Sequence, residues 1–332
     1  MVAYSIIIPV YNRPEEIQEL LEGLSLQTFH DFEVIVVEDG SVDRCESVAE
    51  LYEQKLTIKY FFKENSGPGA SRNFGMERAN GNFFIFLDSD CLVPTDYLQQ
   101  VDQHLRDYPL DAFGGPDSAH QTFTKIQKAI NYAMTSFLTT GGIRGGKKKL
   151  DRFQPRSFNM GISREVFQNV GGFRSFHPGE DPDLSYRIIK SGFKTGLIQE
   201  AFVYHKRRID FSKFIRQVYK FGLARTILMK WHPGSFKLVY ALPSFFLIGL
   251  ICLLGFSIAW PWLLLPILVG GLLLFADAIL RTKSLQIAFM GVFASVIQIA
   301  GYGYGFLTGL WHLWILRKDE KVTFPGLFFP EE

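Results

Sequence analysis

The sequence predicts a parallel α/β fold followed by apolar helices long enough to span a membrane. Short apolar runs alternate with helical patterns over the first two hundred residues, as in parallel sheets covered by helices. One such run, Phe83–Leu87, leads directly into Asp88-Ser89-Asp90. Beyond residue 237 the chain turns largely apolar, and its first uncharged run, Leu238–Ala259, is long enough to cross a bilayer core.

The strands are predicted from runs of apolar residues that end in polar loops. We expect them at Tyr4–Val10, Glu33–Glu38, Ile58–Phe62, Phe83–Leu87 and Asp111–Gly115, with regular structure returning at Ser157–Ile162. The helices are predicted from apolar residues at helical spacing and from first-turn prolines. They are expected from Pro14 to about Leu24, from Cys45 to Tyr52, after the glycine-rich turn 65–73, from Thr95 to Arg106, from Ser163 to Asn169, and from about Pro182 to Gly192.

The cysteines and the first residues of the chain indicate the cellular compartment. Cys45, Cys91 and Cys252 are scattered, with neither a disulfide framework nor a zinc spacing, which is typical of a reducing compartment. The start of the chain lacks the basic and apolar regions of a signal peptide. We therefore expect the first 235 residues to stay in the cytosol.

The C-terminal part predicts contact with a membrane. Between Ala201 and Lys237 there are nine Lys or Arg and one acid, Asp210. A basic amphipathic helix in this juxtamembrane stretch suits the anionic inner leaflet, so the charge does not indicate nucleic-acid binding. Three apolar segments follow: Leu238–Ala259, Trp262–Leu280 and Leu285–Leu316. We expect the glycines of 301–305 to bend the last segment or to end its span. The positions of Lys and Arg around the segments, judged by the positive-inside rule, leave open whether the last segment crosses the membrane fully.

These patterns divide the chain into four parts. They are an α/β domain at 1–205, the basic juxtamembrane helix and linker at 206–237, a transmembrane region of about three segments at 238–316, and a tail at 317–332.

Two acidic motifs carry the candidate chemistry. Asp88 and Asp90 follow a buried strand, where ligands of parallel sheets bind, and paired carboxylates there suit either a divalent cation or a simple turn. Glu180-Asp181 lies at a helix start, where it is either an acidic cap or a functional pair. Neither G-x-G-x-x-G nor a P-loop is present.

The motifs in their order resemble glycosyltransferase family 2. They are SIIIPVYNRPE, VVEDGS, NSGPGASRN, FLDSD, GGF followed by GEDPDLSYR, and Tyr204-His205. The resemblance covers roughly residues 4–225. The resemblance implies the GT-A fold and inverting transfer from a nucleotide-diphosphate sugar. The appended apolar segments resemble those of bacterial members that work at the inner face of the cytoplasmic membrane.

The resemblance also implies roles for single residues. Asp181 is the implied general base, with Glu180 beside it, and Asp39 is the implied partner of the base of the nucleotide. Asp90 is the implied metal ligand, Asp88 reaches the ribose or the metal, and His205 matches a position near the metal in some relatives. The remaining residues implied to bind the nucleotide sugar are Pro9, Tyr11, Asn12, Arg13, Gly67, Ala70 and Arg72.

The implied activity is metal-dependent transfer of one sugar, with Mg²⁺ or Mn²⁺ as cofactor and a UDP- or GDP-linked donor. Processive relatives carry the motif Q-x-x-R-W. The corresponding Gln217-Val218-Tyr219-Lys220-Phe221 departs from it, with Lys in place of Arg and Phe in place of Trp. Lys does not reproduce the bidentate hydrogen bonding of Arg, so transfer of a single sugar is favoured. The expected acceptor is a lipid-linked or cell-envelope glycan, contacted beside membrane lipids. The expected location is the bacterial cytoplasmic (inner) membrane, with the catalytic domain facing the cytosol.

Two alternatives stay open. The acceptor could be polyprenyl phosphate itself, or the chain could be a non-catalytic nucleotide-sugar-binding membrane protein. Acceptor choice is expected to lie in 121–156, where the glycine-rich and basic loop Thr139–Lys149 is either a solvated loop or a lid on an anionic ligand.

Overall fold

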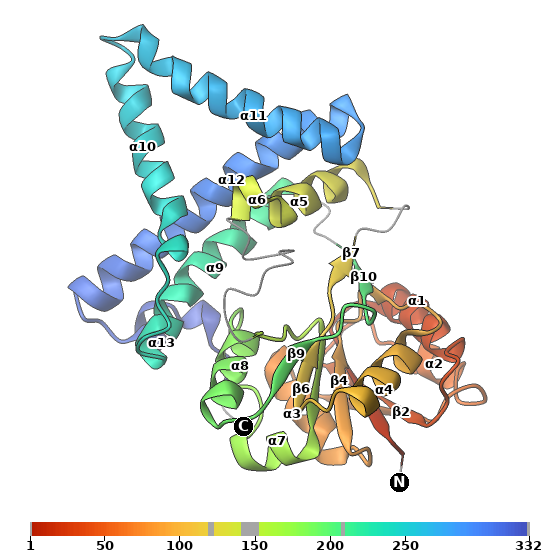
Figure 1. Ribbon diagram of the computed structural model, residues 1–332. Helices are drawn as coiled ribbons and strands as arrows, with labels where there is room; N and C mark the ends of the chain where they lie inside the picture. The colour runs from red at the N-terminus through yellow and green to blue at the C-terminus, as the bar shows by residue number, and fades with distance from the viewer. Residues whose placement is uncertain (1, 119–122, 141–152, 207–209, 331–332) are drawn as a thin grey trace. The chain divides into compact units, whose positions relative to one another are not determined.

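The computed structural model describes residues 2–118, 123–140, 153–206 and 210–330 (Figure 1). Within it the chain forms two compact units. The α/β unit comprises residues 1–120, 149–205 and 328–332, and the helical unit comprises 121–148 and 206–327. One segment of the α/β unit ends at residue 205, whereas 121–148 belong to the helical unit, and the predicted domain boundaries stay a prediction. Most of the loop 139–149 lies outside the described residues.

A seven-stranded sheet forms the centre of the α/β unit. Its strand order is β3 (Ile58–Lys63), β2 (Phe32–Asp39), β1 (Tyr4–Val10), β4 (Phe83–Leu87), β8 (Asn159–Ser163), β6 (Ala112–Gly114) and β9 (Thr195–Leu197). The first four are parallel to one another, as predicted. Strand β8 runs antiparallel to both β4 and β6. The sheet is therefore mostly parallel, with one reversed strand that the apolar pattern did not reveal.

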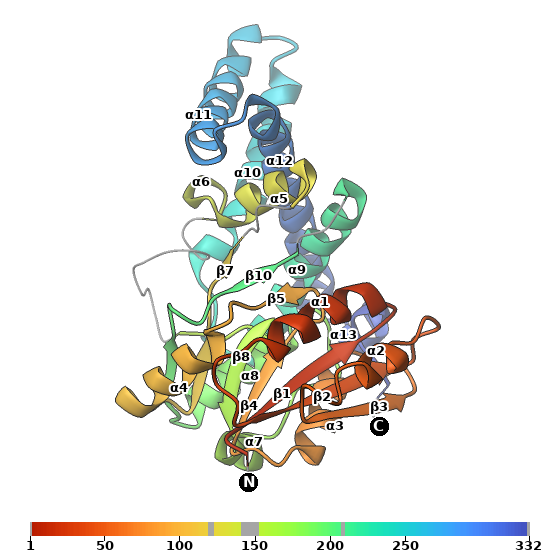
Figure 2. The same ribbon diagram turned by 90° about the vertical axis from the view of Figure 1, so that its right-hand side faces the viewer.

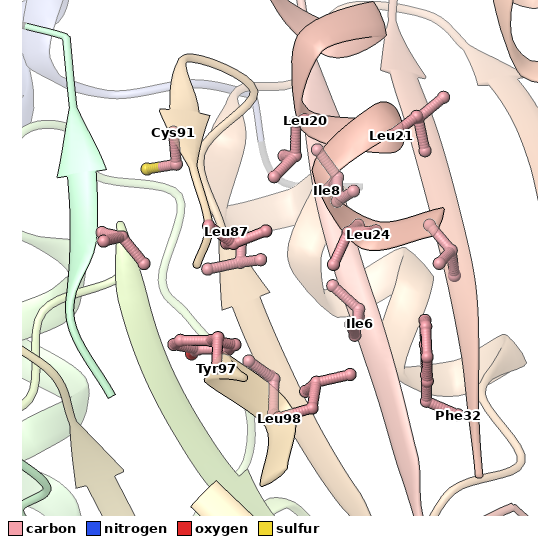
Figure 3. Packing of buried hydrophobic residues seen from close by; sticks show 14 of the residues in the cluster. Ile6, Ile8, Leu20, Leu21, Leu24, Phe32, Leu87, Cys91, Tyr97 and Leu98 are labelled. Atoms are coloured by element: carbon pink, nitrogen blue, oxygen red, sulfur yellow. The ribbon is translucent and has the colours of Figure 1, made fainter. Parts of the chain in front are cut away.

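Helices cover both faces of this sheet, and they can be followed in Figures 1 and 2. One layer contains α1 (Pro14–Ser25), α2 (Glu46–Glu50) and α4 (Tyr97–Asp107), and the other contains α3 (Pro68–Arg78), α7 (Arg164–Val170) and α8 (Glu180–Lys190). Side chains alternate along β1, so Ile6 and Ile8 face the first layer and Ile7 faces the second. Figure 3 shows Leu20 and Leu24 of α1 packed with Ile6 and Ile8. Each such buried side chain contributes about 1.5–3 kcal/mol.

A small second sheet brings distant residues to the carboxyl end of β4. It consists of β5 (Cys91–Leu92), β10 (Val203–His205) and β7 (Asp117–Ser118). His205 pairs with Cys91 across the β10–β5 ladder. Strands this short carry no periodic pattern, and the sequence did not predict them. Their effect is to fix His205 beside the acidic motif that follows β4.

The helical unit consists of α5 (Lys125–Thr135), α6 (Phe137–Thr140), α9 (Phe211–Trp231), α10 (Leu242–Phe256), α11 (Leu264–Thr282), α12 (Leu285–Gly309) and α13 (Glu320–Thr323). A π-helix, Leu310–Ile315, continues α12. Two helical stretches in the described part of the chain, 261–282 and 285–315, are long and apolar enough to cross a membrane, and α10 is shorter. Of about three predicted segments, two thus meet this length criterion.

The glycines near the end of α12 form a helix–helix contact. Gly301, Gly305 and Gly309 lie on one face of α12, where added Cβ atoms would strike Val218, Tyr219 and Thr226 of α9. Small residues at this spacing let two backbones approach closely. Helix α12 continues through the glycine run to Gly309, and the expected bend or end of the span there stays a prediction. A helix is present in the predicted basic stretch as α9, and its Phe214 and Val218 pack with Ala294 of α12. The position of α9 beside a membrane stays a prediction.

Helix α5 lies in 121–156, where the apolar residues predicted no helix. A local signal was present nonetheless. The Thr124 side chain accepts from the Gln127 backbone N–H, and the Gln127 side chain accepts from the Thr124 N–H. This capping box marks a helix start.

Candidate active site

The first part of the site, which we call the donor-side cluster, contains Asp88, Asp90 and His205. Asp88 and Asp90 directly follow β4, and β10 supplies His205. The Nε2 atom of His205 lies 3.1 Å from Oδ1 of Asp90 and 3.8 Å from Oδ2 of Asp88. The Phe158 ring stacks on the His205 ring, with 4.9 Å between centroids. Arg13, at the N-terminal end of α1, forms an ion pair with the other oxygen of Asp90.

The donor-side cluster fits a hard divalent cation. Ligand atoms of Asp90, Cys91 and His205 lie within 4.8 Å of one another. Burial, together with the charges of Asp90 and Asp88, raises the pKa of the Cys91 thiol well above its usual value, so the thiolate form that binds metals is disfavoured. Carboxylate oxygens and one imidazole remain, a set suited to Mn²⁺ or Mg²⁺. The predicted metal-binding role of Asp88, Asp90 and His205 is compatible with this donor set and stays a prediction.

The charge of Asp90 is held by its cationic neighbours. Burial opposes ionisation of this carboxyl, but His205 and Arg13 outweigh burial and keep the pKa of Asp90 below its usual range. The carboxylate is therefore charged across the physiological pH range.

The second part, which we call the base-side helix start, consists of Glu180 and Asp181 at the N-terminus of α8. Glu180 is buried and accepts from the Gly179 N–H at 2.9 Å, while His177 Nδ1 lies 2.9 Å from its other oxygen. Burial would raise the pKa of Glu180, yet His177 and Arg72 lower it to about 2. At Asp181 the positive charges of Arg156, Arg72 and His177 also favour ionisation. Burial and the charge of Glu180 outweigh them and raise the pKa of Asp181 to about 6.

Arg72 joins the two parts of the site. This side chain from α3 is only 2% exposed. Its Nη2 lies 2.7 Å from Oδ1 of Asp88, and its Nη1 lies 3.4 Å from Oε1 of Glu180. The guanidinium also lies against the Phe173 ring, 5.3 Å from its centroid. One buried cation thereby fixes the distance between the donor-side cluster and the base-side helix start.

Asp39 holds the glycine-rich turn before α3. Its Oδ1 accepts from the Ser66 N–H at 2.9 Å and from Lys63 Nζ at 3.0 Å, and its Oδ2 accepts from the Gly67 N–H at 2.9 Å. Gly67 has φ +90° and precedes the helix as its N-cap. The predicted contact of Asp39 with the nucleotide base stays a prediction.

The first predicted nucleotide loop is ordered by its asparagine. Asn12 has a left-handed φ of +51°. Its side-chain oxygen accepts from the backbone N–H groups of Val42 and Asp43 at 2.8 and 3.1 Å. These bonds tie the end of β1 to the loop after β2. Pro9 lies within β1, Tyr11 is exposed beside Asn12, and Ala70 lies in the first turn of α3.

Sequence reasoning missed several residues of the site. His177, Lys63 and Phe158 support Glu180, Asp39 and His205, respectively. His177 is three residues before Glu180, a spacing that could have flagged it. Phe158 carries no comparable local signal, because it reaches His205 only through the folding of the two sheets.

Comparison with known proteins now identifies the family. The model of glycosyl transferase family 2 matches residues 5–171. The minor teichoic acid biosynthesis protein GgaB of Bacillus subtilis is 27% identical over 217 residues, which cover 63% of this chain and 23% of GgaB. The poly(ribitol-phosphate) beta-N-acetylglucosaminyltransferase TarS of Staphylococcus aureus is 37% identical over 115 residues, which cover 32% of this chain and 20% of TarS. The matches thus span less than a third of these curated relatives.

Solved structures share the fold. The mannosyltransferase PcManGT of Pyrobaculum calidifontis, in complex with GDP-Man and Mn²⁺, has a TM-score of 0.59 at 17% identity over 94% of this chain and 88% of its own. S. aureus TarS 1–349 with UDP-GlcNAc has a TM-score of 0.51 at 18% identity, covering 92% and 91%. These likenesses establish the GT-A fold. Because the family model covers half of the chain, the chain belongs to glycosyl transferase family 2.

Proposed function

We propose that this protein is a metal-dependent inverting glycosyltransferase that moves one sugar from a UDP- or GDP-linked donor to a lipid-linked or cell-envelope glycan at the cytoplasmic membrane. The observation that carries the proposal is the pairing of two unlike carboxylates. Asp90 is kept ionised beside His205 and Arg13, whereas Asp181 has a pKa of about 6. An enzyme of this type needs one charged carboxylate for the donor and one basic carboxylate for the acceptor.

The donor binds at the carboxyl ends of β1, β2 and β4 in this proposal. Asp39 contacts the base, and the turn at Gly67 and Ala70 lies along the ribose and diphosphate. The N–H groups at the start of α3 favour phosphate oxygens, and Arg13 and Arg72 add positive charge. The loop residues Pro9, Tyr11 and Asn12 complete the nucleoside side. A cation held by Asp88, Asp90 and His205 would neutralise charge on the leaving diphosphate.

Asp181 performs the proton transfer. Its carboxylate accepts the proton of the acceptor hydroxyl while that oxygen attacks the anomeric carbon from the face opposite the nucleotide. The bond from the anomeric carbon to the phosphate oxygen breaks, and its electron pair leaves with the nucleoside diphosphate. One displacement inverts the anomeric centre. A pKa near 6 leaves Asp181 ionised at neutral pH, yet basic enough to take a proton.

The apolar helices support the proposed location. Helix α11 lies in a stretch of which only 6% is buried within the protein, as expected for a helix whose surroundings are lipid. We propose that the catalytic unit faces the cytosol, where nucleotide sugars are available. Acceptors carried by a lipid would then meet the site at the membrane surface.

The test is donor hydrolysis or transfer by the full chain. Purified protein in detergent with membrane lipids and Mn²⁺ is mixed with UDP- and GDP-sugars, and release of nucleoside diphosphate is followed. We expect release from one donor class, abolished by EDTA and restored by Mn²⁺ or Mg²⁺. No release from any donor would contradict the proposal and favour a non-catalytic binding protein.

The same assay separates two acceptor classes. A hydroxyl acceptor needs the basic carboxylate of Asp181, whereas polyprenyl phosphate is already nucleophilic. We therefore expect transfer to a glycan-bearing lipid to exceed transfer to polyprenyl phosphate. The reverse ratio would assign the chain to the lipid-phosphate reaction.

A further inference from the structure

The chain returns to the α/β unit after the last apolar helix. Phe328 forms an antiparallel bridge with Phe176, and the Phe329 N–H donates to the Ser175 carbonyl at 3.1 Å. The rings of Phe328 and Phe176 lie 5.3 Å apart between centroids. We call Phe328 and Phe329 the tail pair. It forms an isolated β-bridge beside the loop that leads to α8.

Phe328 supports the base-side helix start through one intermediate. Phe176 is 1% exposed, and its ring packs against Gly179, which has φ +132°. Gly179 is the N-cap of α8, and its N–H donates to Glu180. A shift of Phe176 would therefore move the backbone that presents Glu180 and Asp181.

Phe329 supports the other helix start directly. A Cβ added to Gly67 would lie 2.5 Å from the Phe329 ring, so this ring fills the space where a side chain would stand. Gly67 is the N-cap of α3, the helix that carries Arg72. Its N–H is held by Asp39 from the other side at 2.9 Å. The glycine turn is thus fixed between a carboxylate and an aromatic ring.

We infer that the tail pair positions the active site, on the premise of the proposed function. Phe329 packs against Gly67, the N-cap of the helix that carries Arg72, and Phe328 packs against Phe176, which contacts the N-cap before Glu180. Arg72 links these two helices. Both rings are only half-buried, so they lie over the surface of the unit and not in its centre. Their packing fixes the glycine-rich turn before α3 and Asp181 in position relative to each other. This is a positioning role and not a catalytic one.

The test compares three single substitutions in the full chain in detergent. Phe329→Ala and Phe328→Ala remove the tail pair. Phe324→Ala is the matched control, because the Phe324 ring contacts His312 within the helical unit. Binding of UDP and of GDP with Mn²⁺ is measured by calorimetry, and the melting temperature by scanning fluorimetry.

We expect Phe329→Ala to raise the Kd of the bound nucleotide about tenfold, because misplacement of binding groups is costly, with a melting temperature like that of Phe324→Ala. Phe329→Leu, which refills the space over Gly67, should restore most of the affinity. Wild-type affinity in Phe329→Ala, or equal losses in Phe329→Ala and Phe324→Ala, would overturn the inference.

Amide hydrogen exchange tests, without any ligand, whether the tail pair orders the starts of α3 and α8. Amides of 66–72 and 179–184 should exchange faster in Phe329→Ala and Phe328→Ala than in Phe324→Ala. Unchanged exchange there would overturn the inference even if nucleotide binding fell. If the wild type binds neither nucleotide, the proposed function fails, and exchange alone decides the role of the tail pair.

Discussion

The donor-side cluster and the base-side helix start are both acidic, but their surroundings act on the carboxylates in opposite ways. Asp90 has two cationic neighbours, and its pKa is lowered. Asp181 stands beside the charged Glu180, and its pKa rises to about 6. Both carboxyls lose hydration on burial, so the difference comes from the partners. A carboxylate paired with cations suits charge stabilisation, whereas one beside a like charge suits proton transfer.

Removing the base should have the largest effect. We expect Asp181→Asn to lower kcat about 10²- to 10⁴-fold, the range of general base catalysis. The nucleotide should bind as in the wild type, because the donor-side cluster is untouched. Initial rates of nucleoside diphosphate release and calorimetry with UDP or GDP check both statements. Normal turnover in Asp181→Asn would remove this residue from the base role.

Removing the donor-side carboxylate should reduce both binding and rate. Asp90→Ala leaves Arg13 and His205 without their shared partner, and we expect kcat/KM to fall about 10²- to 10³-fold, as for loss of a transition-state charge contact. In contrast to Asp181→Asn, the Mn²⁺-dependent affinity for nucleotide should also fall. Equal Mn²⁺ titrations of Asp90→Ala and the wild type would refute the metal assignment.

The smallest effect tests the cause of the pKa difference. In the wild type, kcat/KM should rise with pH through about 6, because Asp181 must lose its proton to act as base. Glu180→Gln removes the negative neighbour, so the pKa of Asp181 falls and this acid limb moves to lower pH. Full pH–rate profiles measure the shift, with the exposed Glu165→Gln as control. A limb that stays in place would show that Glu180 does not set the pKa of Asp181.

The sequence predicted those parts of the fold that are local. Strands β1 and β4 begin and end where their apolar runs do, because five or more buried residues in a row leave few other structures. The direction of β8 (Asn159–Ser163) was not predictable, because side chains alternate between the two faces of a sheet in the same way whichever direction a strand runs.

In the candidate site, too, the features that are local in sequence were predictable and the contacts between distant residues were not. The acidic motifs are short and contiguous, so a family resemblance could locate Asp88, Asp90 and Asp181, and the structure brings Asp88 and Asp90 together with His205. The supporting contacts are not contiguous. Phe158 reaches His205, and Phe329 reaches Gly67, only after the chain has folded. No pattern within a window of residues encodes such a pairing.

Because Phe329 lies near residue 330, it is synthesised long after Gly67, the residue that it covers. Gly67 leaves the ribosome early, whereas Phe329 follows all the apolar helices. At ordinary elongation rates the delay is on the order of ten seconds or more. Through that interval the surface over Gly67 lacks its aromatic cover. The turn at Gly67 therefore gains this neighbour only after the ribosome has translated 261–282 and 285–315, the two described helical stretches long and apolar enough to cross a bilayer.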